Sequence, residues 1–256
     1  MQNINQKEIY DQRYEGDYRE ELSGFEVARW DALEHFIPNV AGLKKVEKVL
    51  DYGSGSGLYV GLWEKLWSEA EIHCCDISSV ALEKLCMKFP HLGQRIHLVE
   101  NYRADVKDGL FDVVVSVEVM EHIEKVELYL KDINRLLKPG GSFVWTTPCA
   151  NPLSIEHIIY SLTGQIERTP DGYRRWKAEA DIHVRRLKSS EAKTLLESAG
   201  FTNVRFRFRS HLFSYLGTRF PRRLKGLAEK MMKLDYILFR TMPNGASMLG
   251  VAIKKE

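Results

Sequence analysis

Disulfide frameworks, zinc fingers and membrane spans all lack their usual signals in this sequence. The four cysteines form no Cys-x-x-Cys pair and no regular spacing; they stand at positions 74, 75, 86 and 149. No apolar run approaches the roughly 20 residues that cross a bilayer. The first seven residues are polar and lack the apolar core of a signal peptide. These absences together predict a reduced, cytoplasmic protein.

Net charge is also small, at +2 over 256 residues, so we expect no DNA partner. The charge is nevertheless unevenly spread. Residues 201–240 hold ten Lys/Arg against Glu229 and Asp235, a net +8, which leaves −6 for the rest of the chain. This asymmetry indicates a local contact with an anionic partner. With 44% hydrophobic and 28% charged residues, the chain has the composition of one globular domain with sizeable insertions.

One stretch organises the rest of the chain, Val49-Leu50-Asp51-Tyr52-Gly53-Ser54-Gly55-Ser56-Gly57. An apolar run typical of a buried parallel strand leads directly into three alternating glycines, and a helical pattern begins at Leu58. Strand, glycine turn and helix form the unit that binds nucleotide-like ligands at the carboxyl end of a sheet. Glycine lets the backbone turn tightly there and approach a ligand closely.

Two details distinguish this turn from the dinucleotide fingerprint G-x-G-x-x-G. The third glycine comes one residue early, and Asp51 closes the strand two positions before the first glycine. A carboxylate at that position would repel a pyrophosphate but suits a ligand that carries an ammonium and a sulfonium. The stretch resembles motif I of the class I S-adenosylmethionine-dependent methyltransferases, which reads acidic-x-Gly-x-Gly-x-Gly.

Later segments extend this resemblance over residues 46–147. A strand over Glu71–Cys75 ends at Asp76, and a continuous apolar strand over Phe111–Val117 is followed by Glu-x-x-Glu-His. Leu-Lys-Pro-Gly-Gly then ends a helix and precedes a strand at 142–147, in the order found in this family. The expected fold is α/β, a Rossmann-like seven-stranded sheet with helices on both faces. Its last strand, at 248–253, is expected to be antiparallel and to pair with one at 204–208.

The resemblance also implies a division of the chain. Residues 1–45 are expected to form a helical arm over the cofactor, in which a helix from Phe25 to Ile37 ends at Pro38. Residues 46–256 are expected to form the methyltransferase domain. It carries two insertions, an acceptor cap at 148–188 and a basic helical insertion at 210–246.

S-adenosylmethionine is the cofactor that this resemblance implies. The expected contacts are Asp51, Gly53, Ser54, Gly55, Gly57, Asp76, Ile77, Asn101, Val117 and Glu118. Asp76, at the tip of the second strand, is placed to accept both ribose hydroxyls, as in other nucleotide-binding α/β sheets. Glu100, Asn101 and Tyr102 follow the third strand, and none matches the aspartate with which the family binds adenine. Arg29 would meet the methionine carboxylate or, as we favour, lie on a solvated helix face.

Methyl transfer to an alcohol requires alignment and the removal of a proton. The candidate groups are Glu118, Glu121, His122 and His183, of which the first three share one face if their segment is helical. The Glu-x-x-Glu-His pattern resembles small-RNA 2′-O-methyltransferases, in which it binds a divalent metal with a later histidine. All four residues are therefore predicted metal ligands. The alternative is a metal-free site in which His122 or His183 is the general base and Glu121 assists.

The predicted function is O-methylation of a small hydroxylated metabolite, glycan or lipid-linked acceptor, since the chain also resembles ubiquinone-pathway O-methyltransferases. N-methylation is the alternative, although an Asn-Pro-Pro-Tyr type motif is absent. A binding module without catalysis would be expected to lack titratable groups after the fourth strand. An NAD-dependent oxidoreductase is disfavoured by the early third glycine.

The basic segment 219–240 contains an apolar stripe at helical spacing, Leu224, Leu227, Ala228, Met231 and Leu234. Opposite it lie Arg222, Arg223, Lys225, Lys230 and Lys233. Such a helix suits peripheral contact with an anionic membrane, which would fit a lipid-linked acceptor. The interpretation that we favour is packing of the stripe on the domain or on a second subunit. The oligomeric state is left open.

Overall fold

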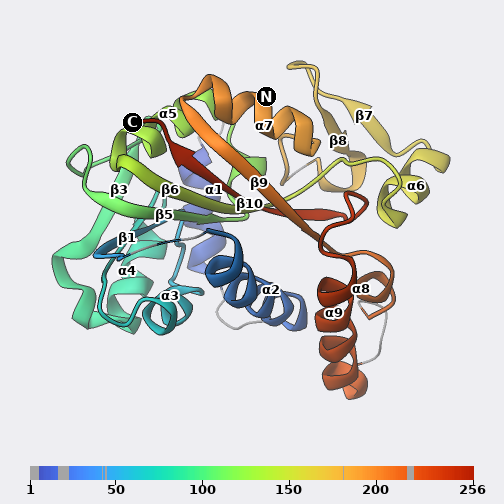
Figure 1. The fold of residues 1–256 in the computed structure, drawn as a ribbon, viewed down its shortest axis with the longest axis horizontal. Coiled ribbons are helices and arrows are strands. Elements are labelled where there is room, and N and C mark those ends of the chain that lie inside the picture. The colour runs from blue at the N-terminus through green and yellow to red at the C-terminus, as the bar shows by residue number, and fades with distance from the viewer. Residues whose placement is uncertain (1–5, 17–22, 42, 44, 181, 218–221) are drawn as a thin grey trace.

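The structure is a computed structural model, and it describes residues 6–16, 23–41, 43, 45–180, 182–217 and 222–256. Its centre is an eight-stranded sheet in the order β4-β3-β2-β1-β5-β6-β10-β9 (Figure 1). The strands are β1 (Lys48–Tyr52), β2 (Glu71–Asp76), β3 (Ile96–Glu100), β4 (Arg103–Ala104), β5 (Phe111–Val117), β6 (Leu137–Pro148), β9 (Phe201–Arg209) and β10 (Ser247–Lys254).

The sheet confirms the predicted fold class. Strands β1, β2, β3, β5 and β6 are parallel, and β10 runs antiparallel to both β6 and β9. The eighth strand is β4, a two-residue strand that pairs antiparallel with β3 at the edge of the sheet. Because βαβ connections are right-handed and place helices on both faces, a sheet of this kind is covered on each side.

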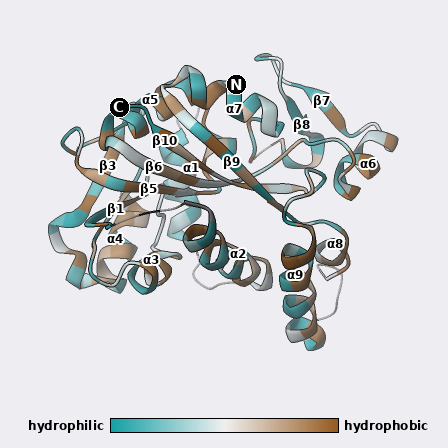
Figure 2. Ribbon diagram, in the orientation of Figure 1, coloured by the Kyte–Doolittle hydropathy of each residue, from teal (hydrophilic) through white to brown (hydrophobic). Residues whose placement is uncertain are grey.

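Two groups of helices cover the sheet. The helices α5 (Val126–Leu136) and α7 (Ser189–Ser198) lie on one face, and α2 (Gly24–Phe36), α3 (Val60–Leu66) and α4 (Ser79–Lys88) lie on the other. Along β5, Val114 packs with the α5 side, and Val113 and Val115 pack with the α3 side. This period of two explains why the strand is apolar at successive positions. Figure 2 shows the hydrophobic residues concentrated along these central strands.

Two predicted element ends differ in detail. The α-helix α2 ends at Phe36, but the chain continues through Pro38 as a π-helix, Ile37–Ala41, because loss of one N–H donor ends only the α pattern. The Leu-Lys-Pro-Gly-Gly segment ends α5 as expected, yet it belongs to β6. Leu137 pairs with Phe111 and Ser142 with Val113, so the four residues between them form an irregularity in the strand.

The two insertions lie beside each other at one end of the sheet. The first holds α6 (Ile155–Leu162) and a separate hairpin of β7 (Ile166–Arg168) and β8 (Arg174–Trp176), which was not predicted. Trp176 is fully buried there and stacks on the rings of His157 and Tyr160. The second holds α8 (Leu212–Gly217) and α9 (Lys225–Phe239).

Helix α9 packs on the domain, but through a face that shares only part of the predicted stripe, namely Ala228. Ala228 and Met232 are buried against α2 and α8, together with Asp235 and Tyr236. Leu224, Leu227 and Leu234 of the predicted stripe are instead exposed, at 39%, 49% and 46%. Residues 219–221 of the basic segment lie outside the described residues. Among the residues that are described, no helix has the length and apolar character of a membrane span.

Candidate active site

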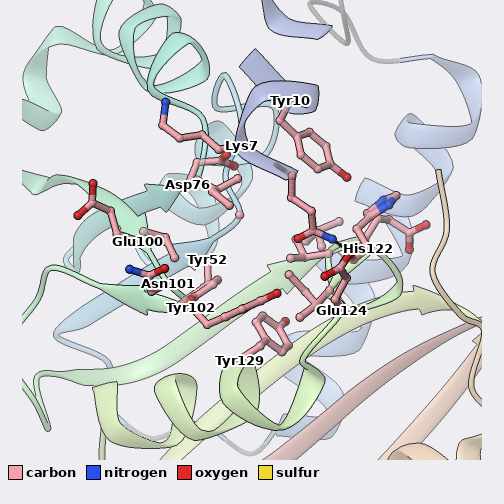
Figure 3. Close-up of a pocket in the computed structure, with 18 of the residues that line it drawn as sticks. Lys7, Tyr10, Tyr52, Asp76, Glu100, Asn101, Tyr102, His122, Glu124 and Tyr129 are labelled. Atoms are coloured by element: carbon pink, nitrogen blue, oxygen red, sulfur yellow. Dashed lines mark hydrogen bonds between the residues drawn. The ribbon is translucent and has the colours of Figure 1, made fainter. Parts of the chain in front are cut away.

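Two cavities open at the carboxyl ends of the parallel strands. The larger one, of about 700 Å³, lies between the tips of β1, β2, β3 and β5 and the helix α1 (Gln6–Glu15). Figure 3 shows Asp76, Tyr52, Asn101 and Tyr102 around it, with Tyr10 on the α1 side. Aromatic rings and carboxylates around such a volume suit a nucleoside-like ligand that stacks through its base and bonds through its ribose.

The glycine turn forms one wall of this cavity. Gly53 and Gly55 have φ values of +80° and +53°, in the left-handed region. A Cβ atom on Gly55 would lie 2.2 Å from the Tyr14 hydroxyl oxygen, and one on Gly53 would lie 2.4 Å from a Val119 methyl carbon. The turn therefore requires glycine for its backbone conformation and also for the close approach of α1 and of the segment after β5.

Asp76 ties the glycine turn to the start of α4. Its Oδ2 accepts a hydrogen bond from the Gly55 N–H at 2.8 Å, and its Oδ1 accepts one from the Ser78 N–H at 2.9 Å. Ser78 caps α4, and its hydroxyl donates to Asp11 of α1 at 2.6 Å. Burial raises the pKa of Asp76. The carboxylate is therefore held firmly at the edge of the cavity, where it is placed to accept further donors.

Six of the ten residues predicted to bind the cofactor line this cavity, namely Gly53, Asp76, Ile77, Asn101, Val117 and Glu118. The lining does not include Asp51, Ser54, Gly55 or Gly57. The Asp51 carboxylate points instead to α3, where its Oδ2 accepts from the Trp63 indole N–H at 2.7 Å, and burial raises its pKa to about 7.

Sequence reasoning missed the residues of α1 at this site. Lys7, Tyr10 and Tyr14 line the larger cavity, whereas α2, the helix we expected to lie over the cofactor, borders the second cavity. Helix α1 has little amphipathic character, so the spacing of its apolar residues does not predict that one of its faces covers a cavity. The available signal was the spacing of Tyr10 and Tyr14, which places two aromatic rings one turn apart on the same face.

The second cavity, of about 550 Å³, lies between α2, α6 and α8. Phe25 and Arg29 line it from α2, and Tyr160 from α6. Glu121 and His183 lie on the side nearest β5. Glu118 lines this cavity as well as the larger one, so the two cavities adjoin at the tip of β5.

Glu118 is fixed at this junction by three interactions of its own backbone and side chain. Its φ is +55°, an unusual value for a residue with a side chain. One carboxylate oxygen is 2.9 Å from Nη2 of Arg29, and the other accepts from the Thr146 hydroxyl at 2.8 Å. Its N–H donates to the Thr146 carbonyl at 2.9 Å. Strain that is compensated so fully is typical of functional positions.

Arg29 is the partner of Glu118. We expected Arg29 to lie on a solvated helix face, and that prediction is wrong. Its side chain is 4% exposed, and Nη1 donates to the Tyr59 hydroxyl at 3.1 Å. Although burial opposes the charged form, the Glu118 carboxylate raises the pKa of Arg29 above its usual value. Arg209 lies close by, also buried, with its guanidinium over the Phe25 ring at 4.4 Å.

Glu121, His122 and His183 converge next to Glu118. Their ligand atoms all lie within 4.8 Å of one another, and among the described residues this is the group that could hold a metal ion. Glu118 does not join it. The segment Met120–His122 is a 3₁₀ turn, so the condition under which residues 118, 121 and 122 would share one helix face is not met, and Glu118 turns toward Arg29.

Hydrogen bonds orient both imidazoles of this cluster. His122 Nδ1 lies 2.6 Å from the Ile182 carbonyl oxygen and so must donate to it. His183 Nδ1 bonds Oε2 of Glu179 at 2.8 Å. Burial opposes the charge on Glu179, but His183 and Arg186 lower its pKa to about 2. Such partners on Nδ1 are the arrangement that fixes histidines acting through Nε2, as metal ligands or as bases.

Glu121 completes the cluster with one oxygen that is unsatisfied. Its Oε2 accepts from the Thr147 hydroxyl at 3.0 Å, while the buried Oε1 has no hydrogen-bond partner in the described structure. Burial, and after it the nearby Glu118 carboxylate, raises the pKa of Glu121 to about 7. A buried carboxylate oxygen that has no hydrogen-bond partner and lies 3.7 Å from His122 Nε2 fits either a cation or a proton in transfer.

Comparison with known protein families shows which family this chain belongs to. Residues 18–205 match the model of a methyltransferase domain family. The chain belongs to the class I S-adenosylmethionine-dependent methyltransferases. It is 27% identical to a ubiquinone/menaquinone biosynthesis C-methyltransferase from Haemophilus ducreyi, covering 74% of this chain and 77% of that protein. It is 28% identical to a ubiquinone biosynthesis O-methyltransferase from Alkalilimnicola ehrlichii, over 61% of this chain and 68% of that protein.

Solved structures agree on the fold of this methyltransferase. One neighbour is the methyltransferase in a complex with the Trm112 activator from Haloferax volcanii, with a TM-score of 0.64, 18% identity and coverage of 96% and 98%. Another is phosphoethanolamine N-methyltransferase 2 from Haemonchus contortus, with a TM-score of 0.60 and 15% identity. The match covers 99% of this chain and 61% of that one. These identities support the architecture alone, and the acceptor has to be argued from the site.

Proposed function

We propose that this methyltransferase methylates a hydroxyl group of a small metabolite, glycan or lipid-linked acceptor held in the second cavity. The observation that carries the proposal is the position of Glu118, which lines both cavities at the tip of β5. S-adenosylmethionine in the larger cavity would then present its methyl group at the junction. Holding donor and acceptor in line there supplies most of what this displacement needs.

The larger cavity offers groups that match the donor. Asp76 is placed to accept the ribose hydroxyls, while Asn101 and Tyr102, both with positive φ, stand where the adenine edge would lie. Tyr10 and Tyr14 cover the cavity from α1. The bound cofactor supplies a methyl group already activated by its sulfonium, so the chain has to bind, orient and exclude water.

The cluster of Glu121, His122 and His183 is proposed to take the acceptor proton. Each histidine is held through Nδ1, which directs its Nε2 to the chemistry. The ion pair of Glu179 with His183 stabilises the imidazolium that forms when His183 accepts a proton.

The same three residues fit a divalent metal, with Glu121 Oε1 as a ligand that has no hydrogen-bond partner in the described structure. A metal held there would lower the pKa of an acceptor hydroxyl. The mixed carboxylate and imidazole set suits Mg²⁺, Mn²⁺, Fe²⁺ or Zn²⁺. Glu118, engaged by Arg29 and Thr146, is left out of this proposed ligand set.

N-methylation is the second candidate, because the acceptor cavity is rich in carboxylates that would attract an amine. Its lining includes Glu26, Glu118, Glu121, Glu156 and Glu179. Arg186 binds two of them, at 2.8 Å from Glu156 and 2.5 Å from Glu179, and Arg29 binds Glu118. These ion pairs reduce the pull on a cation, so a neutral hydroxyl remains the better match.

A turnover assay with matched alcohol and amine acceptors tests the chemistry. If the cluster holds a metal, a chelator should abolish turnover, added Mn²⁺ or Mg²⁺ should restore it, and Glu121→Gln should remove that response. Full activity in excess chelator, with His183→Ala inactive, would favour the general-base site. Glu127→Gln, an exposed carboxylate on α5, is the control and should behave as the wild type. Methylation of amines alone would contradict the O-methylation proposal.

A further inference from the structure

The outer face of α9 is apolar where nothing in the described chain covers it. Four leucines stand at spacings of three, seven and four residues, so they share one side of the helical segment. They are Leu224, Leu227, Leu234 and Leu238, exposed at 39%, 49%, 46% and 53%. The helix already buries Ala228 and Met232 against α2 and α8. Packing within the domain therefore does not account for this outer stripe.

Basic side chains accompany the outer stripe. Lys230 lies beside it on the helix, and Arg223 and Lys225 are exposed at its start. Lys233 lies further round the helix, where it pairs with Asp31 of α2 at 3.5 Å. The acidic residues of α9 are few: Asp235 is fully buried and bonded to His211, and Glu229 is half-buried. The exposed side of the helix is therefore apolar with cationic margins, which is the pattern of a helix at a membrane interface.

The elements next to α9 continue this character around the acceptor cavity. Helix α6 contains no buried residue although it is largely apolar, and Leu162 is 84% exposed. Leu212 and Leu216 of α8 are 46% and 42% exposed. Helix α8 touches both α6 and α9, and Ile159 and Tyr215 from these helices line the second cavity. Figures 1 and 2 show α6, α8 and α9 grouped at one end of the molecule, away from α4.

The basic residues around the leucine stripe indicate which partner covers it. A second copy of this chain would place two helix faces of net positive charge against each other, and like charges in contact are destabilising. An anionic lipid surface instead attracts each basic side chain while the leucines enter the boundary of the acyl region. We propose that α9, with the exposed apolar residues of α6 and α8, binds the surface of an anionic lipid bilayer and places the acceptor cavity beside it. This docking does not depend on which acceptor is methylated.

Vesicle flotation of the full chain tests the proposal. Vesicles of phosphatidylglycerol and phosphatidylcholine should carry the protein upward at about 50 mM salt, and binding should weaken steeply at about 500 mM because the charges are screened. Pure phosphatidylcholine should bind far less. Arg223→Gln with Lys230→Gln should lower partitioning roughly 25-fold, because each basic side chain near an anionic surface contributes about a fivefold factor.

Apolar variants separate lipid binding from other roles. Leu227→Ser, Leu234→Ser and Leu238→Ser together should abolish flotation while circular dichroism and the melting temperature stay close to the wild type, since these residues are exposed. Met87→Ser, which removes a 75% exposed methionine on α4, is the matched control and should float normally. No flotation on anionic vesicles at low salt would overturn the proposal. The proposal would also be overturned if light scattering showed that the wild type is a dimer and that the triple variant is a monomer.

Discussion

Asp51→Asn is expected to stabilise this protein, increasingly so as the pH rises. The Asp51 carboxyl is 2% exposed, and burial raises its pKa from 3.8 to about 7. A carboxyl whose pKa is higher in the folded chain contributes stability that is fully present below about pH 3.8. That contribution is lost as the pH rises toward 7, because the unfolded chain releases its proton first. Asparagine keeps an oxygen that can accept from Trp63 and removes the charge.

The magnitude follows from the linkage slope. One proton held by the folded chain alone costs about 1.4 kcal/mol of stability for each pH unit between the two pKa values. The difference in unfolding free energy between Asp51→Asn and the wild type should therefore widen by about 2.5 kcal/mol from pH 5 to pH 8. Urea unfolding followed by far-ultraviolet circular dichroism at several pH values measures this directly. A difference that stays constant with pH, or narrows, would refute the reasoning.

Asp112→Asn is a control whose effect on the free energy of unfolding should have the opposite sign. Asp112 accepts from the Glu47 and Lys48 N–H groups and pairs with Lys138 at 2.6 Å, and although burial opposes this, these partners lower its pKa. Its contribution is present above about pH 3.8 and is lost only as the pH falls through the lowered value. Asp112→Asn should therefore destabilise the fold by about 2 kcal/mol, nearly constant from pH 5 to pH 8.

Two further substitutions, with Gly226→Ala as a control, test the packing and the ion pairs of the fold. Gly250→Ala should cost about 1–3 kcal/mol, since its Cβ would lie 2.1 Å from a ring carbon of the buried Trp145; Gly226→Ala, with no atom nearby, should be neutral or stabilising in the same thermal melts. Arg186→Ala should cost about 3–5 kcal/mol because it strands Glu156 and Glu179. Unchanged melting of Arg186→Ala would show that these ion pairs do not hold the insertion in place.

Much of the fold could be predicted because its causes are local. The strand at 111–117 is apolar at successive positions since both of its faces are covered, and the glycine turn is required by backbone conformation. The β7–β8 hairpin was missed because its strands have three residues each and mix charged with apolar side chains. It is held instead by Trp176, whose partners His157 and Tyr160 lie in α6.

The site depended on contacts between segments far apart in the sequence. Glu118 could be placed at the end of β5, but its pairing with Arg29 requires α2 to lie beside that strand end. Arg209 alternates with phenylalanines, which predicts a solvent-facing position, yet it is 3% exposed because its guanidinium lies over Phe25. The direction of the Asp51 side chain likewise depends on Trp63. Periodicity describes one segment at a time and carries no information on such partners.

Titration calorimetry with S-adenosylmethionine tests the central claim most directly, namely that the cavity closed by Asp76 holds the methyl donor. One molecule should bind per chain. Asp76→Asn keeps an acceptor for the Gly55 N–H but should weaken binding at least about tenfold, since hydrogen bonds to a charged group are worth about 1.5–3 kcal/mol. Glu127→Gln should bind as the wild type does. Absence of binding to the wild type, or equal affinity for Asp76→Asn, would contradict this assignment of the cavity.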